Sequence, residues 1–139
     1  MSDRLTLDTV QVGDEASALT HTLTRTDLVM YAGASGDFNP MHTDEVTAQA
    51  AGMPSVFGHG MLSMGLLGTA ITNYVGVGNL KSYKVRFTKQ TWPDEELTTR
   101  VVVTGTRTEG GEKLVDLECS LSNAAGEVKV AGDAVARVA

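Results

Sequence analysis

Apolar and polar residues alternate with a period of two through most of the second half of the chain. From residue 80 onward, apolar side chains recur at every second position in four segments, which cover residues 83–87, 97–104, 115–121 and 128–138. This period is typical of strands that bury one face. Groups of turn-forming residues separate the segments, at 92–94, 109–111 and 123–126. We therefore expect four strands joined mostly by hairpins.

The first half of the chain predicts one strand and two short helices. Residues 17–24 alternate leucine and histidine with threonine, so we expect a strand in which His21 shares the apolar face. Thr26 is expected to cap a short helix that ends in a run of small residues. Thr43 is expected to cap a second short helix, which Gly52 ends. A turn that contains several polar side chains separates the two helices.

The longest predicted helix spans residues 59–74 and is apolar on nearly every face, so it must be buried. Gly60, Gly65 and Gly68 each lower its intrinsic stability by about 1 kcal/mol relative to alanine, and we infer that close packing requires them. An antiparallel sheet needs a cover for its apolar face, which such a helix provides. The chain is therefore expected to adopt an α+β hotdog fold, in which an antiparallel sheet wraps around a long buried central helix. Part of this helix remains uncovered, which predicts a dimer.

Composition limits the possible classes of function. With 139 residues the chain is long enough for a single domain, over 1–139, and too short for two of ordinary size. A formal net charge of -6 argues against a nucleic acid or an anionic membrane surface as partner. Cys119, the single cysteine, lies in an alternating apolar run and is expected to be a core residue. No secretion signal or membrane span is visible, so a cytoplasmic protein is expected.

The candidate chemistry lies in the turn between the two short helices. Within six residues this turn contains Asp37, Asn39 and His42, on the two sides of Pro40. On a continuous helix Asp37 and His42 would stand about 140° apart, whereas the proline bends the chain and lets them converge. A carboxylate and an imidazole that meet at one point are the minimal apparatus for general acid and base catalysis. The same residues are also ordinary turn formers, so a solvated turn without catalysis is the alternative.

Two motifs stand out in the sequence, Ser35-Gly36-Asp37-Phe38-Asn39-Pro40-Met41-His42 and His59-Gly60-Met61. They resemble motifs of a known enzyme family, the (R)-specific enoyl-CoA hydratases, also called the MaoC-like or hydratase 2 family. The similarity extends along nearly the whole chain. Within the family the chain most resembles the group of catalytic B-type subunits of mycobacterial (3R)-hydroxyacyl-ACP dehydratases.

The resemblance implies a role for each candidate residue. Asp37 and His42 match the family's acid and base pair, and Asn39 matches the residue that helps to hold the catalytic groups and water. The backbone N–H of Gly60 would form the oxyanion hole, which agrees with the unpaired amides of a helix N-terminus. His59 is expected to shape the turn.

The implied reaction is syn addition of water to a trans-2-enoyl thioester, which gives the (3R)-3-hydroxyacyl thioester, or the reverse dehydration. No metal or redox cofactor is implied, because CoA or the phosphopantetheine of an acyl-carrier protein is part of the substrate. The implied protein partner is an identical or related hotdog subunit. Binding of an acidic carrier protein would require a local basic patch, for which the candidates are Lys81, Lys84, Arg86 and Lys89.

Two other functions fit the same fold. A thioesterase needs a carboxylate that activates water at the thioester carbonyl, and Asp37 could do this. The presence of His42 beside it favours the hydratase. A non-catalytic acyl-binding subunit of a heterodimeric dehydratase would be expected to lack the Asp and His pair, which this chain retains.

Overall fold

The computed structural model describes residues 5–139, which form one five-stranded sheet and four helical segments. The helical segments are α1 (Arg25–Ser35), the 3-10 turn η1 (Pro40–His42), α2 (Glu45–Ala50) and α3 (Gly60–Val75). The strands are β1 (Thr20–Thr22), β2 (Leu80–Phe87), β3 (Glu96–Glu109), β4 (Glu112–Asn123) and β5 (Val128–Arg137). All neighbouring strands are antiparallel, in the order β1-β3-β4-β5-β2.

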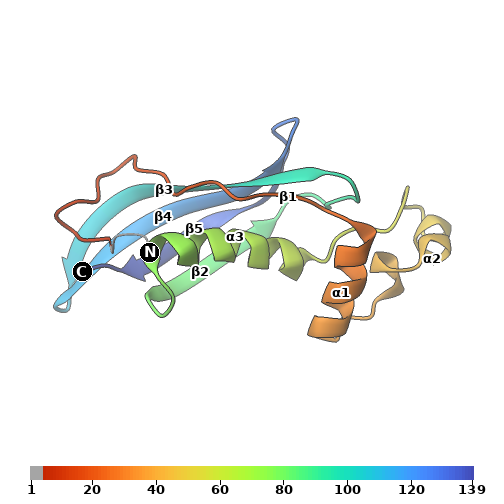
Figure 1. The fold of residues 1–139 in the computed structure, drawn as a ribbon, viewed down its shortest axis with the longest axis horizontal. Coiled ribbons are helices and arrows are strands. Elements are labelled where there is room, and N and C mark those ends of the chain that lie inside the picture. The colour runs from red at the N-terminus through yellow and green to blue at the C-terminus, as the bar shows by residue number, and fades with distance from the viewer. Residues whose placement is uncertain (1–4) are drawn as a thin grey trace.

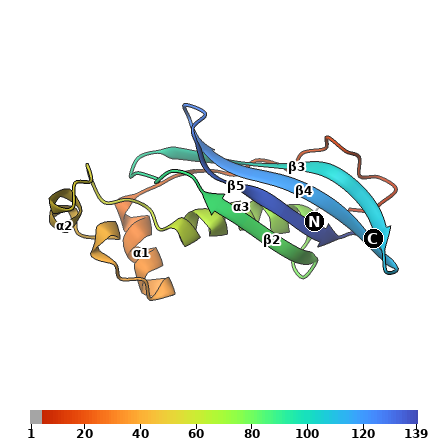
Figure 2. The ribbon, with the colours of Figure 1, turned by 180° about the vertical axis from the view of Figure 1, so that it is seen from behind.

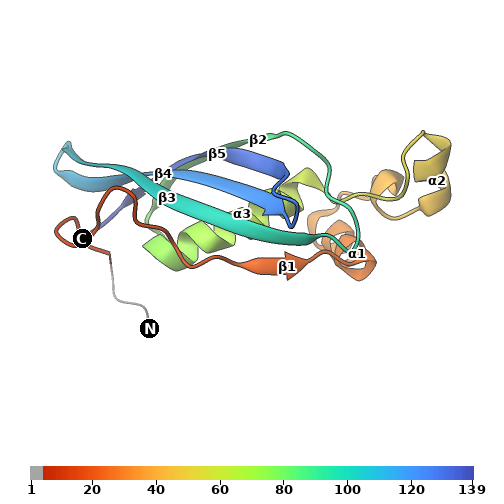
Figure 3. The same cartoon turned by 90° about the horizontal axis from the view of Figure 1, so that it is seen from above.

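The sheet curves around α3, which runs along its concave face (Figures 1 and 3). Leu67 and Ile71 of α3 are fully buried against apolar residues of the long strands, among them Val101 and Leu117. Helices α1 and α2 lie beyond one end of the sheet, close to the N-terminal end of α3 (Figure 2). The predicted hotdog fold, an antiparallel sheet around a central helix, is therefore confirmed.

The connections between strands decide where the site can form. β3 with β4 and β4 with β5 are joined by hairpins, as the sequence predicts. β2 pairs with β5 and not with β3, which follows it along the chain. Residues 88–95 must therefore carry the chain from the β2 edge across to β3, at the end of the sheet that faces α1 (Figure 1).

The first strand is shorter than predicted and its histidine lies elsewhere. β1 contains only Thr20–Thr22, and Leu23, directly after it, is buried. The prediction that His21 shares the apolar face is wrong, because this side chain is exposed and its Nε2 lies 2.7 Å from Asp27 Oδ2. A polar partner on the next helix holds the imidazole outside the core.

Both short helices have N-caps that differ from the predicted ones. Helix α1 is capped by Thr24 and not by Thr26, because Thr24 Oγ1 accepts the N–H of Asp27 while the Asp27 carboxylate accepts the N–H of Thr24. This reciprocal pair is a capping box. Helix α2 is capped by Asp44 and not by Thr43, because one Asp44 carboxylate accepts two backbone N–H groups of the first turn. In both helices the start is set by the residue whose side-chain oxygen accepts N–H groups of the first turn.

The glycines of α3 serve different purposes. A Cβ atom at Gly68 would lie 3.3 Å from the ring of Tyr83, and one at Gly60 would lie 3.2 Å from the ring of Phe87. Close packing therefore explains these two glycines. At Gly65, no described atom apart from its chain neighbours and the helix's own backbone lies within 4 Å of such a Cβ, so packing within the single chain does not explain this glycine. The face of α3 opposite the sheet is open in the single chain, so the helix is only partly buried by its own sheet.

The expectation that Cys119 is a core residue is confirmed. Cys119 is buried in the core, and this burial raises the pKa of its thiol to about 11. A thiol in this environment is unsuited to nucleophilic chemistry near neutral pH. Among the described helices, none is long and apolar enough to cross a membrane.

Candidate active site

The turn after α1 places the candidate residues by local hydrogen bonds. Helix α1 ends at Gly36, whose φ of 77° is in the left-handed region that glycine adopts without strain. Asn39 then caps the 3-10 turn, because its Oδ1 accepts the N–H of Met41 at 3.1 Å. Pro40 occupies the first position of this turn, where its missing N–H is not needed. The chain direction therefore changes sharply between Asp37 and His42, as the sequence predicts.

His42 is held in one protonation pattern by the backbone. Its side chain is buried, and Nδ1 lies 2.6 Å from the carbonyl oxygen of Phe57. Because a carbonyl oxygen only accepts, Nδ1 must carry the hydrogen, and the lone pair of the neutral imidazole lies on Nε2. Nε2 lies 4.0 Å from Oδ2 of Asp37. This distance is too long for a direct hydrogen bond, but it lets both atoms contact a single water oxygen.

His59 supports both members of this pair. Its ring stacks on the His42 ring with centroids 3.9 Å apart, and its Nε2 lies 3.1 Å from the backbone oxygen of Asp37. Tyr31 contacts the same ring edge to face. Burial lowers the pKa of His59, so its imidazole is neutral and donates through Nε2. The sequence assigned His59 only to the turn, and no spacing in the sequence indicates the stack.

The cluster of Asp37, His42 and His59 has the donor types of a metal site, but not the geometry. One ligand atom from each residue lies within 4.8 Å of the others. Zinc bonds of about 2.0–2.1 Å need lone pairs that point to a common centre. The two imidazole rings are stacked with an interplanar angle of 25°, and one nitrogen of each ring already contacts a backbone oxygen. The arrangement suits proton transfer better than metal coordination.

The first turn of α3 provides backbone donors beside this pair. Gly60 directly follows His59, and no side chain of the described residues caps this helix end. The carbonyl of His59 accepts the N–H groups of Leu62 and Ser63, whereas the N–H of Gly60 has no intrahelical acceptor. A helix N-terminus also carries a partial positive charge. Gly60 can therefore stabilise a negatively charged oxygen next to the acid and base pair.

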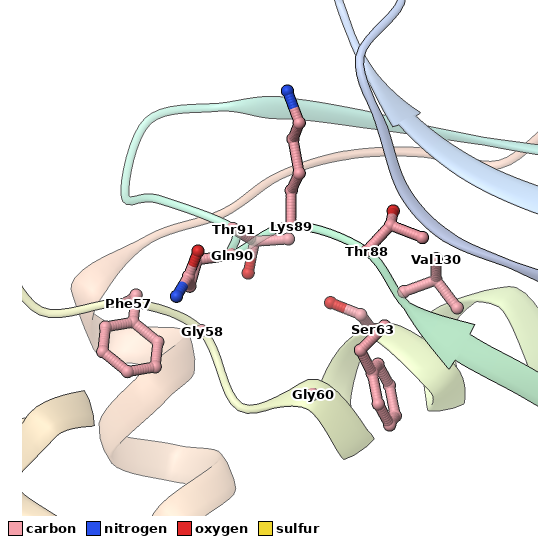
Figure 4. Close-up of a pocket in the computed structure, with 10 residues that line it drawn as sticks. Phe57, Gly58, Gly60, Ser63, Thr88, Lys89, Gln90, Thr91 and Val130 are labelled. Carbon is pink, nitrogen blue, oxygen red and sulfur yellow. The ribbon is translucent and has the colours of Figure 1, made fainter.

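A cavity of about 300 Å³ lies beside Gly60, which forms part of its lining (Figure 4). It lies between the start of α3, the end of β2 and the connection 88–95, and its lining is partly apolar and partly polar. The lining residues are Phe57, Gly58, Gly60, Ser63, Phe87, Thr88, Lys89, Gln90, Thr91 and Val130. Asp37 and His42 do not line it, but Phe57 touches both regions, since its ring packs edge to face on His42. The sequence did not predict the contribution of 88–91.

The surface around the pair is unusually apolar for exposed residues. Asp37 is half exposed. Phe38 follows Asp37 in the chain, Met61 follows Gly60, and the ring of Phe87 packs against Gly60. These three side chains are 69%, 57% and 52% exposed, respectively. Exposed apolar patches of this kind mark surfaces that bind another molecule. We therefore expect another molecule to bind the face on which Asp37 and His42 lie.

The structure is a hotdog domain in which the carboxylate of Asp37 and the imidazole of His42 lie close together near the N-terminal end of the central helix. Residues 9–124 match the family model described as "MaoC like domain". The chain belongs to this MaoC-like family, so the family predicted from the two sequence motifs is confirmed.

Two curated relatives and one solved structure show how the chain relates to the family. The chain is 37% identical over 106 residues to 3-hydroxyacyl-thioester dehydratase Y of Mycobacterium tuberculosis. The aligned region covers 73% of the chain but only 35% of that protein. It is 30% identical over 126 residues to the (R)-specific enoyl-CoA hydratase of Rhodospirillum rubrum. This aligned region covers 89% of the chain and 85% of the relative. The chain thus spans about a third of the first relative and most of the second.

The structural comparison agrees with the fold. The (R)-hydratase from A. caviae involved in PHA biosynthesis superposes with a TM-score of 0.84, over 94% of this chain and 98% of that one. The sequence identity is 23%, so this likeness concerns the fold alone.

Proposed function

We propose that the chain catalyses the hydration of trans-2-enoyl thioesters to (3R)-3-hydroxyacyl thioesters, and the reverse dehydration. The observation that carries the proposal is the lone pair on His42 Nε2, which faces the Asp37 carboxylate at 4.0 Å. Two acceptors at this separation can hold one water molecule by its two hydrogens and direct its oxygen lone pair at C3 of the enoyl group. Membership of the MaoC-like family supports the same acyl-thioester chemistry.

The reaction needs one proton to leave water and one to reach C2. As the bond between the water oxygen and C3 forms, one member of the pair takes the water proton, and the pair returns one proton to C2 on the same face, so that both residues end in their starting states. Asn39 holds the turn through its Oδ1, and within residues 5–139 its amide Nδ2 has no protein acceptor, so it can bind the water or the hydroxyl. General acid and base catalysis of this kind contributes about 100-fold to 10,000-fold in rate.

The enolate that develops during this reaction carries negative charge on the thioester oxygen. In this proposal the N–H of Gly60 and the N-terminal end of α3 stabilise it, which the uncapped start of this helix supports. No metal or redox group is required, because CoA or phosphopantetheine enters with the substrate.

The partner in this proposal is a second hotdog subunit, identical or related. Phe38, Met61 and Phe87 and the open face of α3 would be covered by it, and Asp37 would be shielded from bulk water. The basic patch predicted for a carrier protein is divided, because Lys81 pairs with Glu112 and Lys89 with Glu127. Among the candidates, only Lys84 and Arg86 have no carboxylate partner in the described residues. This favours CoA thioesters as the first substrates to test.

Crotonyl-CoA and the purified chain test the proposal directly. We expect loss of the enoyl absorbance without release of free thiol, and a mass of two subunits in the same buffer. Release of free thiol would indicate the thioesterase instead. A folded chain that leaves crotonyl-CoA and longer enoyl-CoA substrates unchanged, alone and with a related subunit, would overturn the proposal in favour of a non-catalytic subunit.

A further inference from the structure

A fully buried lysine lies behind the cavity wall. Lys129 of β5 has an exposed fraction of 0%. Its neighbours Val128 and Val130 pair with Ser122 and Leu121 of β4, which are adjacent in sequence, so Lys129 is the extra residue of a β-bulge. Successive residues of a regular strand point to opposite faces of the sheet. Because of the bulge, Lys129 and its neighbour Val130 are both buried.

The ammonium group of Lys129 has three acceptors, one for each of its hydrogens. Nζ lies 2.9 Å from the backbone oxygen of Gln90, 2.8 Å from Glu127 Oε1 and 3.1 Å from Glu95 Oε2. Burying a charge without such partners would cost several kcal/mol. Two of the acceptors, Gln90 and Glu95, belong to the connection 88–95 that lines the cavity.

Glu95 extends the network to both sides. Its Oε1 accepts the N–H of Trp92 at 2.8 Å, and its Oε2 accepts Asn123 Nδ2 at 2.8 Å. Burial raises the pKa of Glu95, but the hydrogen bonds from Asn123, Trp92 and Lys129 outweigh burial and lower it. A segment without regular secondary structure is therefore fixed to the β4–β5 hairpin by the buried ammonium of Lys129 and the partly buried carboxylate of Glu95.

The connection also fixes the approach to the candidate oxyanion hole. The N–H of Gly58 donates to the backbone oxygen of Thr91 at 2.8 Å. A Cβ atom at Gly58 would lie 2.1 Å from Thr91 Oγ1, so the two segments pack with no room for a side chain. Figure 4 shows Thr91 and Gln90 beside Gly58, in the segment that leads to Gly60 at the start of α3. Any shift of Thr91 is therefore transmitted to Gly58 and to the start of α3.

We propose that Lys129 is a positioning residue for the substrate site. Through Gln90 and Glu95 it holds the cavity wall, and through the contact between Thr91 and Gly58 it sets the position of the Gly60 N–H. The inference rests on the proposed function for its kinetic part, while its structural part, the control of the Gly58 backbone, stands without it.

The test uses two variants that separate positioning from stability. Lys129→Met removes the ammonium but leaves the carboxylate of Glu95, whose side chain is only 18% exposed, without its cation, so a loss of stability is expected. The double variant Lys129→Met/Glu95→Gln removes both charges and should recover most of the melting temperature, because a neutral pair needs no ionic partner. Neither variant restores the donor to Gln90.

The expected kinetic result is a specific loss in kcat. At temperatures well below melting, the double variant should show kcat for crotonyl-CoA lowered about 10-fold or more, because a donor misplaced by a fraction of an ångström stabilises the transition state less. A merely structural role would leave kcat per folded molecule unchanged. The matched control is Glu96→Gln, at the exposed neighbour of Glu95 that has no ion pair among the described residues, which should keep kcat and KM within about twofold of wild type.

A second readout does not depend on activity. Hydrogen exchange of the Gly58 amide, followed by NMR, should be at least about 10-fold faster in the double variant than in wild type, because its acceptor on Thr91 is no longer held. Wild-type exchange at Gly58 together with wild-type kcat would overturn the inference. If the wild-type chain hydrates no enoyl thioester, the proposed function fails, and the exchange of Gly58 alone then decides whether Lys129 positions this segment.

Discussion

The tautomer of His42 is decided by one backbone carbonyl. Phe57 lies beyond α2 in the chain, and its oxygen accepts the Nδ1 hydrogen of His42 at 2.6 Å. The stack on neutral His59 lies on one face of the same ring. His42 is thereby presented to the Asp37 side with a lone pair on Nε2, which is the form that a general base needs.

Replacement of either member of the pair tests their roles. Asp37→Asn and His42→Ala are each expected to lower the hydration rate by at least about 100-fold, the lower range for the loss of a general acid or base. Asp37 is half exposed, so its variant should keep the wild-type melting temperature. The rate is measured with crotonyl-CoA, and circular dichroism checks the fold. Near-normal rates in both variants would remove the pair from the mechanism.

The residue pair was predictable from the sequence, whereas its supports were not. Pro40 shows that Asp37 and His42 cannot share one helix, and this local rule placed them together. His59 contacts them only because α3 starts beside the turn, which is a tertiary fact. Lys129 looks like an exposed strand residue in the alternating pattern, and only the bulge reveals its burial.

At the scale of elements, the helix starts show how local hydrogen bonds decide between neighbouring threonines. Thr24 and Thr26 are both acceptable caps by residue type. Asp27 stands three residues after Thr24 and closes the capping box with it, while it also receives a bond from His21. Burial raises the pKa of Asp27, but these hydrogen bonds outweigh burial and lower it.

The cap assignment predicts a difference between two otherwise similar variants. Thr24→Ala should lower the free energy of unfolding by about 1 kcal/mol, the usual loss for an N-cap. Thr26→Ala should change it little, because Thr26 lies inside the first turn and is exposed. Chemical denaturation of both variants measures the difference. A larger loss for Thr26→Ala would restore the cap first expected from the sequence.

The strands were predictable from their period of two, but the close contact between β2 and β5 was not. A Cβ atom at Gly132 would lie 2.0 Å from the backbone oxygen of Lys84 and 2.7 Å from the Cα of Val85. Backbone atoms cannot move aside as a side chain can. In the sequence Gly132 merely occupies one position of the apolar face, so this constraint depends on which strand becomes its neighbour.

Gly132→Ala is therefore expected to be strongly destabilising, by about 3 kcal/mol or more, at the upper end of overpacking effects. Gly33→Ala is the matched control, because a Cβ at this exposed position in α1 has no described atom within 4 Å apart from its chain neighbours and the helix's own backbone. The control should raise the free energy of unfolding by up to about 1 kcal/mol through helix propensity. Equal stability of Gly132→Ala and wild type would show that the two strands separate more easily than the structure indicates.

At the scale of the whole molecule, the site forms where three distant parts of the chain meet. The turn at 37–42, the start of α3 and the connection 88–95 all lie at the end of the sheet that faces α1 (Figure 1). The order of elements was enough to predict the hotdog fold, because one helix and one sheet can cover each other in few ways. It was not enough to predict the cavity, which depends on β2 pairing with β5 and on the crossing that follows.

The carboxylates of the acidic molecule give stability a defined dependence on pH. Hydrogen bonds from Lys129 and Lys89 lower the pKa of Glu127 from its ordinary value of 4.5 to about 2. A group whose pKa is lower in the folded state contributes stability that is present above its unfolded pKa and is lost as pH falls through its folded pKa. This contribution of Glu127 is therefore complete above about pH 5 and disappears toward pH 2.

Glu127→Gln removes this titration while keeping a side chain of the same shape. We expect the variant to be less stable than wild type at pH 7, with the two unfolding free energies converging as pH falls from about 5 toward 2. Urea denaturation at a series of pH values measures both curves. Glu96→Gln, at an exposed residue without an ion pair among the described residues, reports the effect of removing one negative charge from a chain of net charge -6. Parallel curves for Glu127→Gln and wild type would show that Lys129 and Lys89 do not hold this carboxylate.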